Sequence, residues 1–129
     1  MSIRLRRIDH VVLTVADLAA TIGFYERVLG MRHVVSGERH ALHFGDCKIN
    51  LHPEANDFPA ELKAAAPTLG SGDLCLVADG PIEAIADHLR ACGVEIIDGL
   101  VARDGALGAM TSVYVRDPDA NLVEVSVYG

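Results

Sequence analysis

Hydrophobic and polar residues alternate along the segment Ile8–Val15, where β-branched side chains are frequent. This pattern is typical of a strand with one buried face. The spacing of the apolar residues then becomes helical, with Asp17 in the position of an N-cap and Gly30 as the stop. Three further runs, separated by turn residues, predict strands at residues 32–35, 40–44 and 48–52. The first half of the chain is therefore predicted to fold as β-α-β-β-β.

The second half of the chain shows the same order of elements. A strand is predicted at Asp73–Val77, and a helix is predicted from Pro81 to Cys92, where Gly93 ends it. The glycine-rich segment 103–108 is interpreted either as a lid or as a hairpin connection. Further strands are predicted at residues 94–97, 111–116 and 121–128.

The two halves also correspond in their motifs, which indicates an internal duplication. The sequence Val28-Leu-Gly-Met31 in the first half matches Ala91-Cys-Gly-Val94 in the second. We predict a single domain over residues 1–129, with modules at residues 5–52 and 72–129. Residues 53–71, rich in Pro, Ala and Gly, are predicted to connect the modules.

Alternation along the strands sorts their side chains onto an apolar face and a polar face. A sheet with one face in water shows the same alternation. However, imidazole, carboxylate and amide groups occur at matching positions of the repeat, which favours a polar cleft for a ligand. The polar face is predicted to hold His10, Thr14, Lys48, Asn50, His52, Asp73, Cys75, Glu124 and Ser126, joined by Ser112, Tyr114 and Arg116 if their strand keeps the same phase.

Composition narrows the class of protein. The chain has 129 residues, half of them hydrophobic, and a formal charge of −7, which argues against a nucleic-acid partner. No apolar run approaches the roughly 20 residues of a membrane-spanning helix, and residues 1–7 lack the apolar core of a secretory signal. Three cysteines without CxxC spacing do not suggest a disulfide framework. We expect a cytoplasmic protein with no membrane partner.

Three segments resemble the vicinal oxygen chelate superfamily, which includes glyoxalase I, bleomycin-binding proteins and extradiol dioxygenases. The resemblance implies an α+β fold, in which two tandem βαβββ modules form a U-shaped curved mixed sheet around a cleft. It also implies a small-molecule substrate or ligand and a homodimer. More narrowly, Phe44–His52 and Gly72–Leu76 look like the subgroup of glyoxalase domain-containing protein 5 and its bacterial relatives. The three segments are Ile8-Asp-His-Val-Val-Leu-Thr-Val15, Phe24-Tyr-Glu-Arg-Val-Leu-Gly-Met31 and Arg116-Asp-Pro-Asp-Ala-Asn-Leu-Val-Glu-Val125.

The resemblance implies one divalent metal (Mn, Fe, Ni, Zn or Mg) at the positions of His10, Asn50, Asp73 and Glu124. Glyoxalase I has His, Glu, His and Glu there, so His10 and Glu124 match the pattern. Asn50 and Asp73 depart from it, and because an amide is a weak ligand and aspartate a hard one, the set favours oxygen-preferring ions. We predict His10, Asp73 and Glu124 as ligands, Glu124 and Asp73 as the catalytic groups, and Asn50 as a substrate contact.

His52 is a further candidate ligand, two residues beyond Asn50 and about 7 Å further along the same strand face. With His10 and a carboxylate it would resemble the two-histidine, one-carboxylate triad of non-haem iron enzymes. The alternative interpretation of His52 is a substrate contact or a solvated strand end. For His10 the alternative is a buried histidine with no ligand. The remaining histidines (His33, His40, His43 and His88) are assigned to surface strands and a helix face.

Tyr114 and Arg116 are candidate contacts for an anionic or hydroxylated substrate. Arg116 has an alternative role in fixing the turn at residues 117–119, and Glu124 has an alternative role as the ion-pair partner of Arg116 or Lys48. The leading hypothesis is a metal-dependent lyase or isomerase in which the cation polarises vicinal oxygens and Glu124 or Asp73 moves a proton. Two alternatives are a metal-free sequestering protein and a ring-cleaving dioxygenase.

Overall fold

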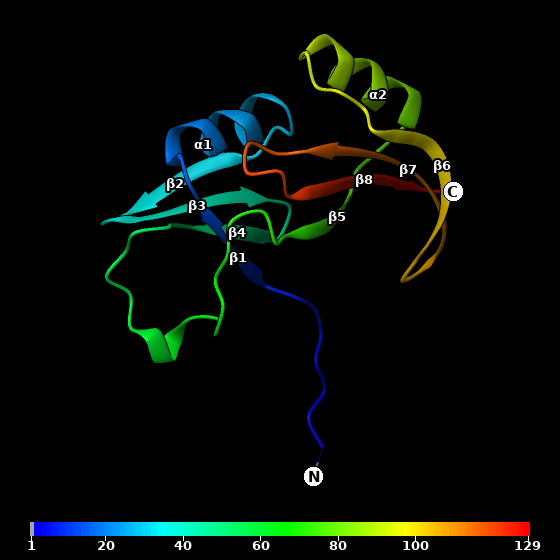
Figure 1. Ribbon diagram of the computed structural model, residues 1–129. Helices are drawn as coiled ribbons and strands as arrows, with labels where there is room; N and C mark the ends of the chain where they lie inside the picture. The colour runs from blue at the N-terminus through cyan, green and yellow to red at the C-terminus, as the bar shows by residue number, and fades with distance from the viewer. Residues whose placement is uncertain (1) are drawn as a thin grey trace. The chain divides into compact units, whose positions relative to one another are not determined.

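The computed structural model describes residues 2–129. These residues form two compact units: the first ends at Pro67, and the second spans Thr68–Gly129. Within the described range, each unit contains one four-stranded mixed sheet and one α-helix (Figure 1). The α+β class and the two βαβββ modules are therefore confirmed. The boundary between the units falls inside the predicted connector, and the single domain stays a prediction.

The first unit has the sheet order β1-β4-β3-β2, with β1 parallel to β4 and the other pairs antiparallel. The Asp17 side chain accepts a hydrogen bond from the Ala20 amide and caps α1 as predicted. A short 3-10 turn at Ala60–Leu62 lies in the segment after the last strand. The elements are β1 (His10–Val15), α1 (Leu18–Arg27), β2 (Arg32–Ser36), β3 (Arg39–Phe44) and β4 (Cys47–Pro53).

The second unit repeats this arrangement with the order β5-β8-β7-β6, in which β5 is parallel to β8. Figure 1 shows α2 on one side of this sheet. No helix in residues 2–129 is long and apolar enough to cross a membrane. The elements are β5 (Asp73–Val77), α2 (Ile82–Ala91), β6 (Asp98–Gly105), β7 (Gly108–Arg116) and β8 (Leu122–Tyr128).

Each unit buries the apolar face of its own strands. Leu13, Leu42, Ile49 and Leu51 are buried in the first unit, together with Tyr25 of α1. The second unit buries its strand valines in the same way: Val113, Val115, Val123 and Val125. Full burial of one such side chain contributes about 1.5–3 kcal/mol. The predicted division into an apolar and a polar face therefore holds in both sheets.

One strand of the second unit was misplaced by the sequence pattern. Residues 94–97 do not form a strand; β6 begins at Asp98 and continues to Gly105. The segment 103–108 is consequently a hairpin, in which Gly105 pairs with Gly108, and no separate lid. The hydrophobic pattern did not reveal β6 for two reasons. This strand lies at the edge of its sheet, where exposed polar residues are tolerated, and its register shifts between Asp98 and Val101.

The Asp-Pro-Asp-Ala-Asn motif forms the turn between β7 and β8, and its Asp117 and Asn121 are buried. The Asp117 carboxylate accepts hydrogen bonds from the Asp119 and Asn121 amides at 2.9 Å and from the Asn121 side-chain amide at 2.9 Å. The Asn121 side-chain Oδ1 in turn accepts from the Gly72 amide at 2.6 Å. Because Gly72 precedes β5, this motif holds Asp73 at the start of β5 beside β8.

Candidate functional site

The polar face of the first unit is arranged in rows by the pairing of β1 with β4. His10 lies opposite Lys48, Val12 opposite Asn50, and Thr14 opposite His52. Asn50 also lies opposite Ala41 of β3. The structure thus brings Asn50 and His52 onto the face that the sequence predicted, and it places His10 on the same face.

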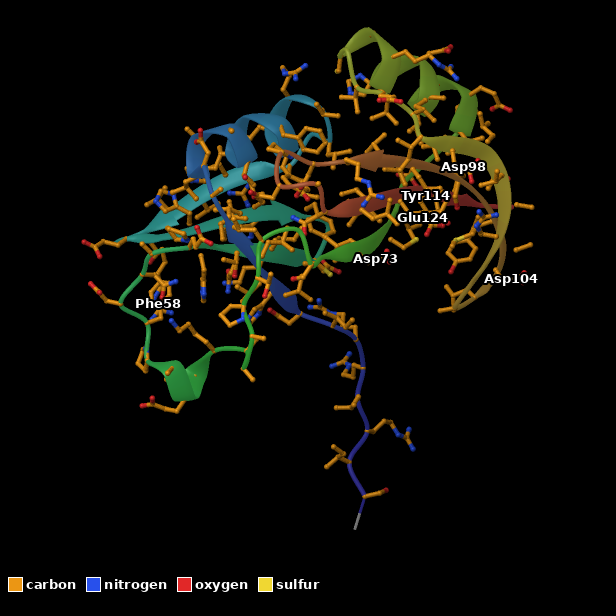
Figure 2. The ribbon with its side chains drawn as sticks, viewed as in Figure 1. Phe58, Asp73, Asp98, Asp104, Tyr114 and Glu124 are labelled. Carbon is orange, nitrogen blue, oxygen red and sulfur yellow. The ribbon has the colours of Figure 1, made fainter. Side chains whose placement is uncertain are left out.

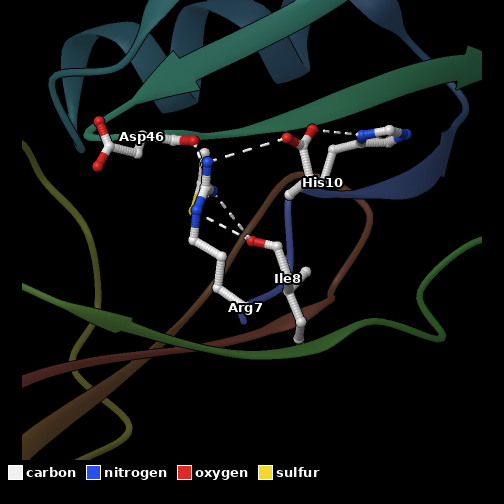
Figure 3. A network of polar contacts seen from close by, with 6 residues as sticks. Arg7, Ile8, His10 and Asp46 are labelled. Atoms are coloured by element: carbon white, nitrogen blue, oxygen red, sulfur yellow. Dashed lines mark hydrogen bonds and ion pairs between the residues drawn. The ribbon is translucent and has the colours of Figure 1, made fainter. Parts of the chain in front are cut away.

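His10 is oriented by a residue that the sequence analysis did not select. Its ring Nδ1 lies 2.8 Å from the Asp9 carboxylate, and the Arg7 guanidinium lies 4.0 Å from the same carboxylate (Figure 3). The hydrogen bond from His10 holds the pKa of Asp9 below its usual value. Because an ionised carboxylate can only accept, Nδ1 is the donor, and Nε2 is the nitrogen left for a ligand. His10 is exposed rather than buried, so the alternative of a buried histidine does not hold.

His52 lies apart from His10. It is opposite Thr14, four residues along β1 from His10, or about 13 Å at strand spacing. Its ring packs against Phe58, with 4.4 Å between the ring centres. Burial lowers the pKa of His52, and the positive charges of Arg39 and Lys63 lower it further. This spacing argues against one metal held by both histidines, and the assignment of His52 as a ligand stays a prediction.

A pocket of about 220 Å³ lies on this polar face of the first unit. The Arg39 guanidinium lies over the Phe58 ring at 5.3 Å from its centre. The sequence analysis did not select Phe58, which comes from the irregular segment after β4, or Arg39. It assigned His43 to a surface strand because no partner for it was apparent. The polar lining residues are Ser36, Arg39, His40, His43, Lys48, Asn50 and His52.

In the second unit, Glu124 lies at the centre of the polar face. It is opposite Tyr114 on β7 and opposite Cys75 on β5. Figure 2 shows Tyr114 and Glu124 next to each other and Asp73 at the start of β5. Partial burial raises the pKa of Tyr114, Arg103 opposes this rise, and Glu124 adds to it. The phenol is thus held in its neutral form.

Arg103 of β6 contacts both the Tyr114 hydroxyl and the Asp98 carboxylate. Its Nε donates to the Tyr114 hydroxyl at 2.9 Å, and its guanidinium lies 3.5 Å from the Asp98 carboxylate. Residues 94–97 had been assigned to this strand, so the sequence analysis missed both Arg103 and Asp98. The hairpin tip is held as well, because the Leu107 amide donates to the Tyr128 hydroxyl at 3.1 Å.

A chain of hydroxyl groups ends at Glu124. The Ser126 hydroxyl donates to Glu124 Oε2 at 3.2 Å, and the Ser112 and Ser126 hydroxyls are 2.6 Å apart. Cys75 Sγ lies 3.3 Å from the Ser126 hydroxyl. A pocket of about 410 Å³ opens beside Glu124 and Cys75. Cys75 is exposed as a whole, but desolvation raises the pKa of its thiol and so lowers the thiolate fraction at neutral pH.

Asp73 and Arg116 occupy the same row of the sheet, because each lies opposite Leu122. Arg116 Nη1 donates to the Ala120 carbonyl at 3.2 Å, which is the turn-fixing contact that the sequence analysis offered as its alternative role. A substrate contact for Arg116 stays a prediction.

A model of the Glyoxalase/Bleomycin resistance protein/Dioxygenase superfamily matches residues 7–125. The chain belongs to this superfamily. Virulence protein STM3117 of Salmonella typhimurium is 49% identical over 123 residues, which are 95% of this chain and 84% of that protein.

Two solved structures resemble this chain to different degrees. The integron cassette protein VCH_CASS1 from the mobile metagenome of V. cholerae has a TM-score of 0.95 and 48% identity, with 100% of each chain covered. The lactoylglutathione lyase of Agrobacterium tumefaciens has a TM-score of 0.74 and 25% identity, covering 96% of this chain and 95% of that one.

The predicted metal ligands of this superfamily member come from both units. His10 and His52 belong to the first unit, and Asp73 and Glu124 belong to the second. Within residues 2–129, no group of three or more His, Cys, Asp or Glu side chains is placed to hold a metal ion. The donor chemistry itself fits a divalent cation, since one imidazole nitrogen and two carboxylates are ligands of such ions.

Proposed function

We propose that the chain is a metal-dependent lyase or isomerase that acts on a small oxygenated molecule. The ligands proposed, taken from the family pattern alone, are His10 of the first unit and Asp73 and Glu124 of the second. A divalent cation bound there would polarise vicinal oxygens of the substrate and lower the pKa of the neighbouring C–H bond. Membership of the superfamily and the likeness to a lactoylglutathione lyase support this reaction class.

The hydrogen bond between Asp9 and His10 is the observation that carries the proposal. Histidines that bind metals donate their second ring nitrogen to a carboxylate or carbonyl, which fixes the tautomer and the ring orientation. Asp9 accepts from Nδ1 of His10 at 2.8 Å, and its lowered pKa keeps it ionised at neutral pH. The pair therefore prepares Nε2 of His10 as a ligand.

Glu124 is the proposed proton-transfer group. Its carboxylate borders a pocket of about 410 Å³, and the Ser126 hydroxyl binds only one of its oxygens, Oε2. Tyr114, kept neutral beside it, can hydrogen bond to the carboxylate or to a substrate oxygen. In this proposal Ser126 orients the carboxylate and Glu124 removes a proton next to a substrate carbonyl.

Elemental analysis of the purified full chain tests the metal. We expect about one divalent metal per chain in the wild type and its loss in Glu124→Ala and His10→Ala. Glu83→Ala, which removes an exposed carboxylate from α2, is the matched control and should retain the metal. Absence of metal in the wild type under every loading condition would overturn the proposal.

Proton transfer is tested separately. Hydroxyacetone, which carries vicinal oxygens, is incubated in D₂O with the metal-loaded protein, and deuterium incorporation is followed by NMR. Exchange that needs both the metal and Glu124 supports the proposal. Equal exchange by the wild type and Glu124→Gln would contradict the assigned role of Glu124.

A metal-free sequestering protein is the second candidate. Asn50, a weak ligand, occupies a predicted ligand position, and no group of three metal-binding side chains lies within either unit in the described part of the chain. Ligand binding without bound metal and without turnover would support this candidate. A homodimer is also proposed, and light scattering of the full chain at several concentrations tests it.

A further inference from the structure

The pocket of about 220 Å³ on the first unit is lined by positively charged residues, although the chain as a whole is acidic. The chain as a whole carries a formal charge of −7. Yet Arg39 and Lys48 line the pocket together with three histidines, and none of the described residues that line it is acidic. Neither Arg39 nor Lys48 forms an ion pair with another residue in the range 2–129. The pocket therefore offers two cations with no acidic residue in its lining, although Lys48 is close enough to Asp9 to help lower the pKa of that carboxyl.

The two cations lie at opposite ends of the pocket. Lys48 lies opposite His43 on β3. Arg39 and His52 lie at the other end, and both contact Phe58. Lys48 and His52 are four residues apart on β4, about 13 Å at strand spacing, and the long side chains of Lys48 and Arg39 can lean into the space between them.

The middle of the pocket is shaped for a short carbon chain. Ala41 lies there opposite Asn50, and its small side chain leaves space between the two charged ends. Phe58 offers an apolar surface, and the Arg39 guanidinium lies over its ring, 5.3 Å from the ring centre, in a cation–π contact. A volume of about 220 Å³ is below the roughly 300–1,000 Å³ typical of pockets for drug-sized ligands, so the occupant is small.

We propose that this pocket binds a small dicarboxylate, with one carboxylate on Arg39 and the other on Lys48 and His43. The planar guanidinium of Arg39 can donate two parallel hydrogen bonds to a carboxylate, and Lys48 supplies a compact charge. The Asn50 side-chain amide can donate to the same ligand between the two ends. This inference goes beyond the proposed function, because binding here uses none of the proposed metal ligands and none of the residues around Glu124.

Titration of the isotope-labelled full chain with succinate, followed by NMR, tests the inference. We expect a saturable shift of amide resonances in β3 and β4, and no such shift with the neutral analogue succinamide. Arg39→Gln and Lys48→Gln should each weaken succinate binding about tenfold, because each loses a charge-assisted hydrogen bond. Arg39→Lys, which keeps the charge but loses the planar fork, should lie between the wild type and Arg39→Gln.

Arg90→Gln is the control, since it removes the same charge from an exposed position on α2 in the second unit. It should bind succinate like the wild type. Thermal unfolding of each variant shows whether the fold is intact. Succinate that binds no more tightly than succinamide, or equally to both pocket variants and the wild type, would overturn the proposal. Equal binding of butyrate would overturn the assignment of a second carboxylate.

The two proposals can fail separately. His10→Ala should lose the metal and still bind succinate, and Arg39→Gln should keep the metal and lose succinate. If metal is absent from the wild type while succinate binds as expected, only the proposed enzyme is rejected. If the metal is present and succinate shifts no resonance of β3 or β4, only the dicarboxylate pocket is rejected.

Discussion

Ser126 donates a hydrogen bond to the Glu124 carboxylate across 3.2 Å, two residues along the same face of β8. Ser126 is fully buried, and its hydroxyl also meets the Ser112 hydroxyl and the Cys75 thiol. Since Ser126 donates to Glu124, Ser112 must donate to Ser126. One buried hydroxyl therefore links the core of the second unit to the proposed catalytic group.

Ser126→Ala is expected to lower the free energy of unfolding by about 1–3 kcal/mol, because the Ser112 hydroxyl loses its partner inside the core. Chemical denaturation measures this change. Ser71→Ala, which removes an exposed hydroxyl bonded to the Thr68 carbonyl, is the control and should change stability by less than about 0.5 kcal/mol. Equal effects of the two substitutions would contradict the linking role of Ser126.

The sequence predicted the strands whose faces are sharply divided, and it failed where other parts of the unit decide the structure. The alternation in β1, β4 and β8 placed His10, Asn50 and Glu124 on the polar faces correctly, because side-chain direction follows strand parity. The edge strand β6 carries no such alternation. Its Arg103 and Asp98 reach Tyr114 only through pairing that the local sequence does not encode.

The residues of the first pocket illustrate the same limit. Phe58 comes from the irregular segment after β4, and only tertiary contacts bring it to Arg39 and His52. Asp9 was missed for a different reason, since the signal was available: a carboxylate next to a candidate metal-binding histidine is a frequent partner of its second nitrogen.

Asp9→Asn is expected to weaken metal binding about 10–100-fold if His10 is a ligand, because the amide cannot hold the His10 Nδ1–H as the ionised carboxylate does. Competition with a metal-binding dye measures the affinity. Asp46→Asn alters an exposed carboxylate of the same unit, and only the backbone oxygen of Asp46 contacts Arg7 at 2.8 Å. That variant should bind metal like the wild type, and unchanged affinity in Asp9→Asn would argue against the positioning role.

Cys75 is expected to react slowly with iodoacetamide. Burial raises the pKa of its thiol, and the negative charge of Glu124 raises it further. Because the thiolate is the reacting species, the midpoint of the rate against pH should lie above that of a free cysteine derivative. In a Cys47→Ser, Cys92→Ser background, Glu124→Gln should move the midpoint downward. A midpoint insensitive to Glu124→Gln would show that the two side chains do not interact.

His52 is expected to make the first unit less stable in acid. Burial and the charges of Arg39 and Lys63 lower the pKa of His52 in the folded chain below its usual 6.5. The unfolded chain then binds more protons than the folded chain, so this contribution to stability is present above about pH 6.5 and is lost as the pH falls through the folded pKa. Denaturation at pH 7 and pH 5 should show a smaller acid loss in His52→Gln than in the wild type. Equal losses would contradict this prediction.

The turn held by Asp117 and Asn121 is expected to control both stability and the position of Asp73. Asn121 is buried, and its side chain bonds to the Asp117 carboxylate at 2.9 Å and to the Gly72 amide at 2.6 Å. Asn121→Ala leaves both partners unsatisfied in the interior, so we expect a loss of about 2–4 kcal/mol in the free energy of unfolding.

The control for this turn is Asp79→Ala, which removes an exposed side chain after β5 and should change stability by less than about 0.5 kcal/mol. Hydrogen exchange separates the two roles of Asn121. Because Gly72 is released, the amides at the start of β5 should exchange faster in Asn121→Ala, while those of β1 in the first unit should keep their wild-type rates in native buffer. Faster exchange throughout the chain, with no excess at the start of β5, would show that Asn121 contributes only to global stability and does not position Asp73.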